Sequence, residues 1–138
     1  MTDVRDIVPE EAWRLLQSDK NAQLVDCRIK AEWNFVGVPD LSALGKKTVF
    51  VEWQGFPNTG PNPNFVAELG AQGLKKDQVL VFICRSGGRS LSAAKLAVQN
   101  GFAVCHNLAG GFEGDLDSFH HRGQIGGWKC AGLPWTQG

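Results

Sequence analysis

The segment VLVFICRSGGRS, residues 79–90, constrains the fold of this 138-residue chain more than any other part of it. Its first five residues are apolar and partly β-branched, which is typical of a strand buried within a parallel sheet. A cysteine and a glycine pair follow, and after Ser90 the apolar residues of LSAAKLAVQN recur at helical spacing. The order strand, tight loop, helix places Cys84 at the carboxyl end of a buried strand, facing a helix N-terminus.

Helical and strand patterns alternate along the rest of the chain. The patterns predict helices over residues 9–17, around 65–69 and over 91–99, and strands over residues 23–27, 48–52, 78–83 and 103–106. Such alternation predicts an α/β fold, with a central, mostly parallel sheet and helices on both faces. We expect one domain over residues 1–138, with the glycine-rich segment 110–138 as an irregular C-terminal tail packed on it.

Composition excludes several classes of partner. Fourteen basic and fourteen acidic side chains cancel, so no net field attracts nucleic acid or an anionic membrane. No apolar stretch approaches the roughly 20 residues of a membrane span, and the polar N-terminus does not resemble a secretory signal. The four cysteines are irregularly spaced and without a C-x-x-C pair, which favours reduced thiols. These features together predict a cytoplasmic protein.

The loop after the strand carries the chemistry. A helix N-terminus and nearby cations stabilise a thiolate, and Arg85 and Arg89 supply two such cations. Gly87 and Gly88 allow positive φ, so that successive N–H groups can form an anion-binding nest. The loop therefore predicts a nucleophilic Cys84 that attacks an anionic or sulfur-bearing substrate.

Three segments resemble the rhodanese family of sulfurtransferases. CRSGGRS, from Cys84 to Ser90, resembles the active loop of that family. DCRIKAEW, with Asp26, Arg28, Glu32 and Trp33, resembles its D-x-R-x-x-x-E-(F/Y) signature, and NLAGGF, residues 107–112, is similar to its double-glycine segment. The chain therefore looks like a single rhodanese-like domain.

The resemblance implies a sulfurtransferase. Cys84 would take a sulfane sulfur from a donor such as thiosulfate or a persulfide, hold it as a cysteine persulfide, and pass it to a thiol or cyanide. A protein thiol is a further candidate acceptor, and no cofactor or metal is implied. Asp26, Arg28 and Glu32 would support the active loop. The residues implied to bind the substrate are Arg85, Ser86, Gly87, Gly88, Arg89 and Ser90.

One stretch departs from the family pattern. After Glu32 the chain continues as NFVGVPDL, which lacks the histidine of the usual turn. We expect Trp33, Trp53 and Phe56 to form a more aromatic rim around the pocket.

Two alternative functions share this fold. Cdc25-type phosphatases and arsenate reductases place five residues between cysteine and arginine, whereas four separate Cys84 from Arg89 here. The shorter loop favours sulfur over a tetrahedral oxyanion. The other alternative is a rhodanese-like module that binds a partner or carries sulfur without catalysis.

Other reactive residues have structural explanations. Cys27 and Cys105 suit core packing in strands, while Cys130 is a candidate to resolve an oxidised Cys84. Arg28 and Glu32, at i and i+4, are also compatible with a helix-surface salt bridge. The three histidines lack the spacing of metal ligands.

Overall fold

A five-stranded parallel sheet forms the centre of the chain. The computed structural model describes residues 4–54 and 60–137. Its strands are ordered β1-β6-β5-β2-β4, and every neighbouring pair is parallel. The strands are β1 (Arg5–Ile7), β2 (Gln23–Asp26), β4 (Val49–Phe50), β5 (Val79–Ile83) and β6 (Val104–Leu108).

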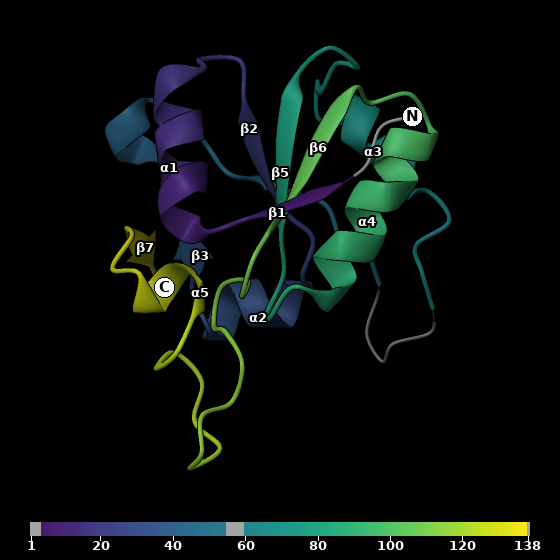
Figure 1. Cartoon of the computed structure of the whole chain (residues 1–138). Coiled ribbons are helices and arrows are strands. Elements are labelled where there is room, and N and C mark those ends of the chain that lie inside the picture. Colours follow the sequence, from purple (N-terminus) through teal and green to yellow (C-terminus); the bar gives the residue numbers. More distant parts are fainter. Residues whose placement is uncertain (1–3, 55–59, 138) are drawn as a thin grey trace.

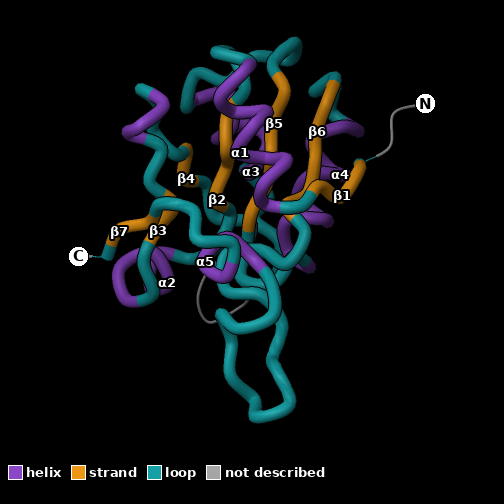
Figure 2. Tube along the Cα trace, turned by 60° about the vertical axis from the view of Figure 1, so that its left-hand side comes forward, coloured by secondary structure: helices purple, strands orange, loops and turns teal. Residues whose placement is uncertain are grey.

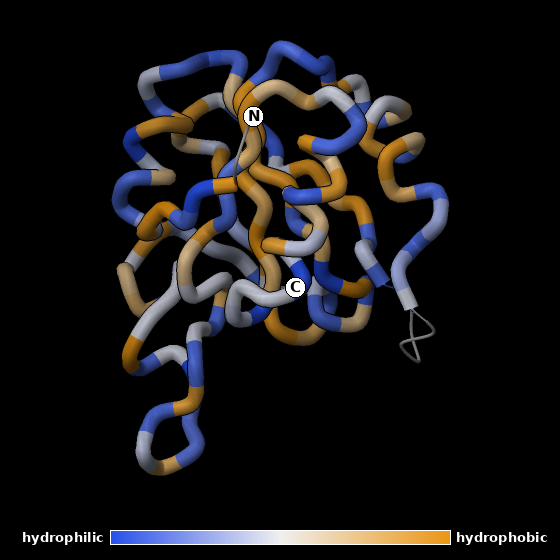
Figure 3. The backbone as a smooth tube through the Cα atoms, turned by 45° about the vertical axis from the view of Figure 1, so that its right-hand side comes forward, coloured by the Kyte–Doolittle hydropathy of each residue, from blue (hydrophilic) through white to orange (hydrophobic). Residues whose placement is uncertain are grey.

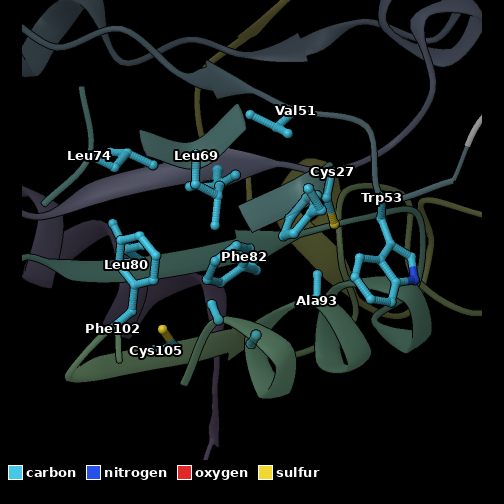
Figure 4. Close-up of a cluster of buried hydrophobic side chains, with 14 of the residues drawn as sticks. Cys27, Val51, Trp53, Leu69, Leu74, Leu80, Phe82, Ala93, Phe102 and Cys105 are labelled. Atoms are coloured by element: carbon cyan, nitrogen blue, oxygen red, sulfur yellow. The ribbon is translucent and has the colours of Figure 1, made fainter. Parts of the chain in front are cut away.

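Three helices cover the two faces of the sheet, so that the predicted α/β class is confirmed. Helix α1 (Pro9–Ser18) lies on one face, and α3 (Phe65–Ala71) and α4 (Gly88–Gln99) lie on the other (Figure 1). Each face has its own apolar cluster, and β5 contributes to both of them. Leu80 and Phe82 point toward α3 and α4 (Figure 4), whereas Val81 and Ile83 point toward α1. Burial on both faces explains the unbroken apolar run of β5. In Figure 3 much of the backbone at the centre of the molecule has hydrophobic colours, and many of the outer turns are hydrophilic.

Most of the shorter elements gather near the carboxyl edge of the sheet, whereas a short 3-10 helix lies toward its amino edge (Figure 2). Helix α2 (Lys30–Phe35) follows β2, and the 3-10 helix η1 (Ser42–Leu44) precedes β4. Strands β3 (Val38–Pro39) and β7 (Trp135–Thr136) form a small antiparallel sheet. The C-terminal segment from residue 110 thus contains α5 (Gly127–Cys130) and β7.

Several element boundaries differ from the predicted ones. Strand β1 escaped prediction because Arg5 and Asp6 are exposed and only Ile7 is buried. The strand expected over 48–52 is reduced to the two residues of β4. Helix α4 begins at Gly88, earlier than the apolar periodicity indicates. Within the described part of the chain, no helix combines the length and hydropathy needed to cross a membrane.

Candidate active site

Cys84 lies immediately after β5, at the carboxyl edge of the sheet, and its exposed fraction is only 1%. Its Sγ accepts hydrogen bonds from the backbone N–H of Gly87 (3.2 Å) and of Ser90 (3.3 Å), and lies 3.2 Å from the Ser90 hydroxyl. Ser90 belongs to the first turn of α4, whose N–H groups have no partner within the helix. The sulfur therefore accepts hydrogen bonds from N–H groups at the start of α4, and the same donors can stabilise a negative charge on it.

Gly87 gives the loop its direction. Its φ of +115° lies in the region that favours glycine, and it is the N-cap residue of α4. This conformation lets the chain turn from the end of β5 into the helix within four residues and directs the Gly87 N–H toward the sulfur.

Arg89 faces Glu32 of α2. Its guanidinium donates two hydrogen bonds to the Glu32 carboxylate, at 2.7 and 2.9 Å. Partial burial of Glu32 raises the pKa of its carboxyl, but the hydrogen bonds and charge of Arg89 outweigh burial, and the net pKa is lowered. The same hydrogen bonds raise the pKa of Arg89. This ion pair joins α2 to the first turn of α4.

Arg28 has a different partner from the one its spacing indicates. The alternative of an Arg28–Glu32 salt bridge on a helix surface is wrong, because Arg28 precedes α2 and is fully buried. Its Nε and Nη2 donate to the Asp26 carboxylate, at 2.9 and 2.7 Å, and Nη2 also donates to the Gly37 carbonyl at 2.8 Å. Its guanidinium lies over the ring of Phe112, 4.4 Å from the centroid. Asp26 and Arg28 thus support the segment that carries Phe112.

That segment, residues 110–114, packs directly on the backbone of the active loop. The Phe112 N–H donates to the Cys84 carbonyl (2.7 Å), and the Glu113 N–H donates to the Arg85 carbonyl (2.9 Å). Gly111 has a φ of +63°, and a Cβ atom there would lie 2.5 Å from the Cys84 carbonyl oxygen. The double glycine of NLAGGF therefore allows two backbone segments to approach more closely than other residues permit.

The remaining loop residues face outward to different degrees. Arg85 and Gly88 are exposed, and Ser86 is partly buried. Arg85 makes no ion pair with a carboxylate among the described residues. Arg85 is consequently the arginine of the loop whose charge remains available to an incoming anion.

The two tryptophans expected at the rim, Trp33 and Trp53, pack against other rings. Trp53 is buried in the apolar cluster between the sheet and helices α3 and α4 (Figure 4). Its ring centroid lies 5.1 Å from that of Phe65. Trp33 packs edge-on against Phe50, 5.0 Å between centroids. Phe56 lies outside the described residues.

The other cysteines differ from Cys84 in their surroundings. Burial raises the pKa of Cys27 well above its ordinary value, and electrostatic interaction with the neighbouring Cys84 adds to this rise. Burial also raises the pKa of Cys105, to about 12. Cys130 is exposed on α5. Across the described residues, no three histidine, cysteine, aspartate or glutamate side chains are grouped so that they could hold a metal ion.

Two polar residues near the loop were not singled out from the sequence. Asn107 in β6 bonds to the Gly87 carbonyl and to Asp6 of β1. A polar residue inside a buried parallel strand was an available signal for Asn107. Asp6 had no such signal, because it is exposed in a strand of three residues.

Comparisons with known proteins agree with the fold. The family model described as the STR4 middle domain matches residues 7–138. An uncharacterized protein of Rickettsia conorii is 36% identical over 132 residues, covering 96% of this chain and 97% of that protein. The chloroplastic rhodanese-like domain-containing protein 4 of Arabidopsis thaliana is 30% identical over 93% of this chain, which corresponds to 25% of its own length.

Solved structures show the same architecture. The crystal structure of Rv0390 from M. tuberculosis has a TM-score of 0.91 and 47% identity, covering 99% of this chain and 100% of that one. A polysulfide-sulfur transferase homodimer from Wolinella succinogenes has a TM-score of 0.65 at 22% identity, covering 99% of this chain and 80% of that one. The second likeness concerns the fold alone.

Proposed function

Because the chain belongs to the rhodanese-like family described as the STR4 middle domain, we propose that it is a sulfurtransferase that works through a persulfide on Cys84. One observation carries this proposal: the Cys84 sulfur is the acceptor of two backbone N–H groups and lies within hydrogen-bond distance of the Ser90 hydroxyl. These donors stabilise an anionic sulfur, which is the reactive form of a thiol.

With thiosulfate as donor, the Cys84 thiolate attacks the outer, sulfane sulfur. The new S–S bond forms on Cys84 as the donor S–S bond breaks, and sulfite leaves with the electron pair. A thiolate or cyanide acceptor then attacks the outer sulfur of the persulfide, and the electron pair of that bond returns to Cys84. The loop holds the sulfur in both steps, and no external oxidant or reductant is consumed.

The two arginines of the loop support different parts of this function. Arg85 is exposed and suits the capture of an anionic donor such as thiosulfate or a low-molecular-weight persulfide. Arg89 forms an ion pair with Glu32 and in our proposal stabilises the first turn of α4. Acceptors of the thiol class, including a protein thiol, attack the outer sulfur as the thiolate.

The loop size argues against oxyanion chemistry. Only four residues separate Cys84 from Arg89, and the Arg89 guanidinium is directed to Glu32. A phosphatase needs such a guanidinium on the equatorial oxygens of its substrate. We therefore expect no hydrolysis of aryl phosphates that depends on Cys84.

Mass spectrometry of the protein and of its tryptic peptides after incubation with thiosulfate tests the proposal. We expect one added sulfur atom on the tryptic peptide that contains Cys84, released as thiocyanate when cyanide is added. Cys84→Ser should abolish both signals and keep the circular dichroism spectrum, since a hydroxyl is far less acidic than a thiol.

Cys130→Ser is the matched control, because it removes the exposed thiol and leaves the loop intact. Sulfur uptake that persists in Cys84→Ser and is lost in Cys130→Ser would exclude Cys84 as the nucleophile. A protein that binds no sulfur on any cysteine would instead favour the non-catalytic binding module.

A further inference from the structure

The amide of Asn107 is held in one orientation. It lies in β6 opposite Phe82 of β5, and only 4% of the residue is exposed. Its Nδ2 donates to Asp6 Oδ1 at 2.9 Å and to the Gly87 carbonyl at 3.1 Å. Since both partners only accept hydrogen bonds, the nitrogen must face them. The amide oxygen Oδ1 consequently faces Ser90.

The Ser90 hydroxyl therefore lies between two acceptors. Its Oγ is within hydrogen-bond distance of Asn107 Oδ1 and 3.2 Å from Cys84 Sγ. A hydroxyl has one proton to donate, so it serves only one of these acceptors at a time. Ser90 is fully buried, and the two acceptors thus compete for this single donor.

We propose that Asn107 is a positioning residue that sets the charge on the active-site sulfur through the direction of the Ser90 hydroxyl. With a neutral thiol, S–H donates to Ser90 Oγ and Ser90 donates to Asn107 Oδ1, so each group is satisfied. With a thiolate, the Ser90 hydroxyl turns to the sulfur, and Asn107 Oδ1 loses its donor. Asn107 therefore favours the thiol and limits the fraction of thiolate.

The consequence for catalysis rests on the proposed function. When an acceptor removes the outer sulfur, the electron pair of the S–S bond returns to Cys84 as a thiolate. The Ser90 hydroxyl turns toward this charge, and turns back to Asn107 once the sulfur takes up a proton. Asn107 thus governs the return of the loop to its resting state after each transfer.

The test measures the rate of Cys84 alkylation by iodoacetamide against pH, in a Cys130→Ser background. Burial raises the pKa of Cys27 well above its ordinary value and that of Cys105 to about 12, which disfavours alkylation of both, and the label is read on the peptide that contains Cys84. The effect of Asn107→Leu on the alkylation rate is measured in two backgrounds, one with Ser90 and one with Ser90→Ala. Loss of the Gly87 contact affects both backgrounds alike, so the difference between them isolates the effect that passes through Ser90.

We expect the alkylation midpoint to move lower by about 0.5–1 pH unit when Asn107→Leu is made with Ser90 present, relative to the same change in Ser90→Ala. Ser90→Ala alone should raise the midpoint, and Ser92→Ala, an exposed serine on the same helix, should leave it unchanged. Equal shifts in the two backgrounds would overturn the proposal, as would an unchanged midpoint in Ser90→Ala.

Thermal melts identify variants that fail to fold, and the smaller Asn107→Ala then replaces Asn107→Leu in the same comparison. The readout does not depend on sulfur transfer. A Ser90-dependent shift in a protein that takes up no sulfur would refute the proposed function while supporting the role of Asn107. Sulfur transfer without such a shift would support the proposed function and refute the role of Asn107.

Discussion

At the residue scale, one sulfur atom belongs both to a helix terminus and to the reactive centre. Cys84 accepts two N–H groups around the start of α4, and the other cysteines of the described chain lack this environment. Cys27 lies close by, because its N–H donates to the Ile83 carbonyl (3.0 Å) and extends the β2–β5 register to the position opposite Cys84. Position next to the site therefore does not by itself confer reactivity.

Thiol reactivity tests this distinction. At pH 8 in the folded protein, iodoacetamide should label Cys84 and Cys130, and leave Cys27 and Cys105 unlabelled until the protein is unfolded. Burial raises the pKa of both latter thiols, that of Cys105 to about 12, and so holds them in the unreactive form. Peptide mass spectrometry over a time course gives each rate. Labelling of Cys27 ahead of Cys84 would contradict the assignment.

The two arginines of the loop should respond differently to removal. Arg85→Ala should leave the free energy of unfolding within about 0.5 kcal/mol and raise the KM for thiosulfate several-fold, because Arg85 is exposed. Arg89→Ala should cost about 2 kcal/mol, because it leaves the partly buried Glu32 carboxylate without its partner.

Urea unfolding and steady-state kinetics measure these effects. In a Glu32→Gln background Arg89→Ala should cost clearly less, because no charged carboxylate remains unpaired. Equal effects of the two arginines on stability and on KM would show that the division between them is wrong.

At the element scale, the position of the active loop depends on the segment that packs against it. Residues 110–114 hold the Cys84 and Arg85 carbonyls, and the buried Asp26–Arg28 pair supports this segment through the ring of Phe112. The three motifs of the sequence, although far apart along the chain, meet through these contacts. The DCRIKAEW motif stabilises the NLAGGF segment, and the NLAGGF segment holds the CRSGGRS loop in position.

Gly111→Ala tests this arrangement, with Gly73→Ala as its control. Both glycines have positive φ, of +63° and +88°, but a Cβ at Gly73 meets nothing within 4 Å. Gly73→Ala should therefore lower the free energy of unfolding by about 1 kcal/mol, which is the backbone cost of placing alanine at positive φ. Gly111→Ala should lower the free energy of unfolding by about 1–3 kcal/mol more, because its Cβ would overlap with the Cys84 carbonyl.

The measurements are urea unfolding and sulfur uptake on Cys84. Only Gly111→Ala should reduce sulfur uptake in the protein that remains folded. If both variants lose the same stability and keep the same uptake, residues 110–114 do not position the loop.

At the scale of the whole molecule, the stability of the fold should fall in two separate steps on acidification. Burial lowers the pKa of His106 below 6.5, so the unfolded chain binds this proton more readily and stability falls as the pH drops through the region below 6.5. The pKa of Glu32 is lowered below 4.5, so its contribution is complete above pH 4.5 and is lost as the pH falls through its folded-state value.

Urea unfolding from pH 3 to 7 checks both steps. Glu32→Gln should be less stable than the parent at neutral pH and should match it at the acid end. His106→Asn should flatten the dependence just below pH 6.5 and keep the step at lower pH. A constant difference between Glu32→Gln and the parent across the whole range would contradict the sign of this linkage.

The sequence predicted what depends on local pattern and missed what depends on packing. The apolar run of β5 and the periodicity of α4 indicated the sheet, the helix and the position of Cys84. The partner of Arg28 could not be predicted by assuming a helix through residue 28, because Ile29 caps α2 and Arg28 stays outside it. The role of Asn107 requires β1, β5 and β6 to be adjacent, which no local pattern specifies.

The pairing of β1 with β6 also affects when the active loop acquires its surroundings during synthesis of the chain. Asp6 is synthesised 101 residues before its partner Asn107. Until then β1 has no neighbour in the sheet, and the loop of Cys84 lacks both Asn107 and Phe112. Contacts of such long range form slowly in folding. Cys84 is therefore synthesised before the residues that surround it, and the environment of the thiol is complete only after Asn107 and Phe112 have joined the fold.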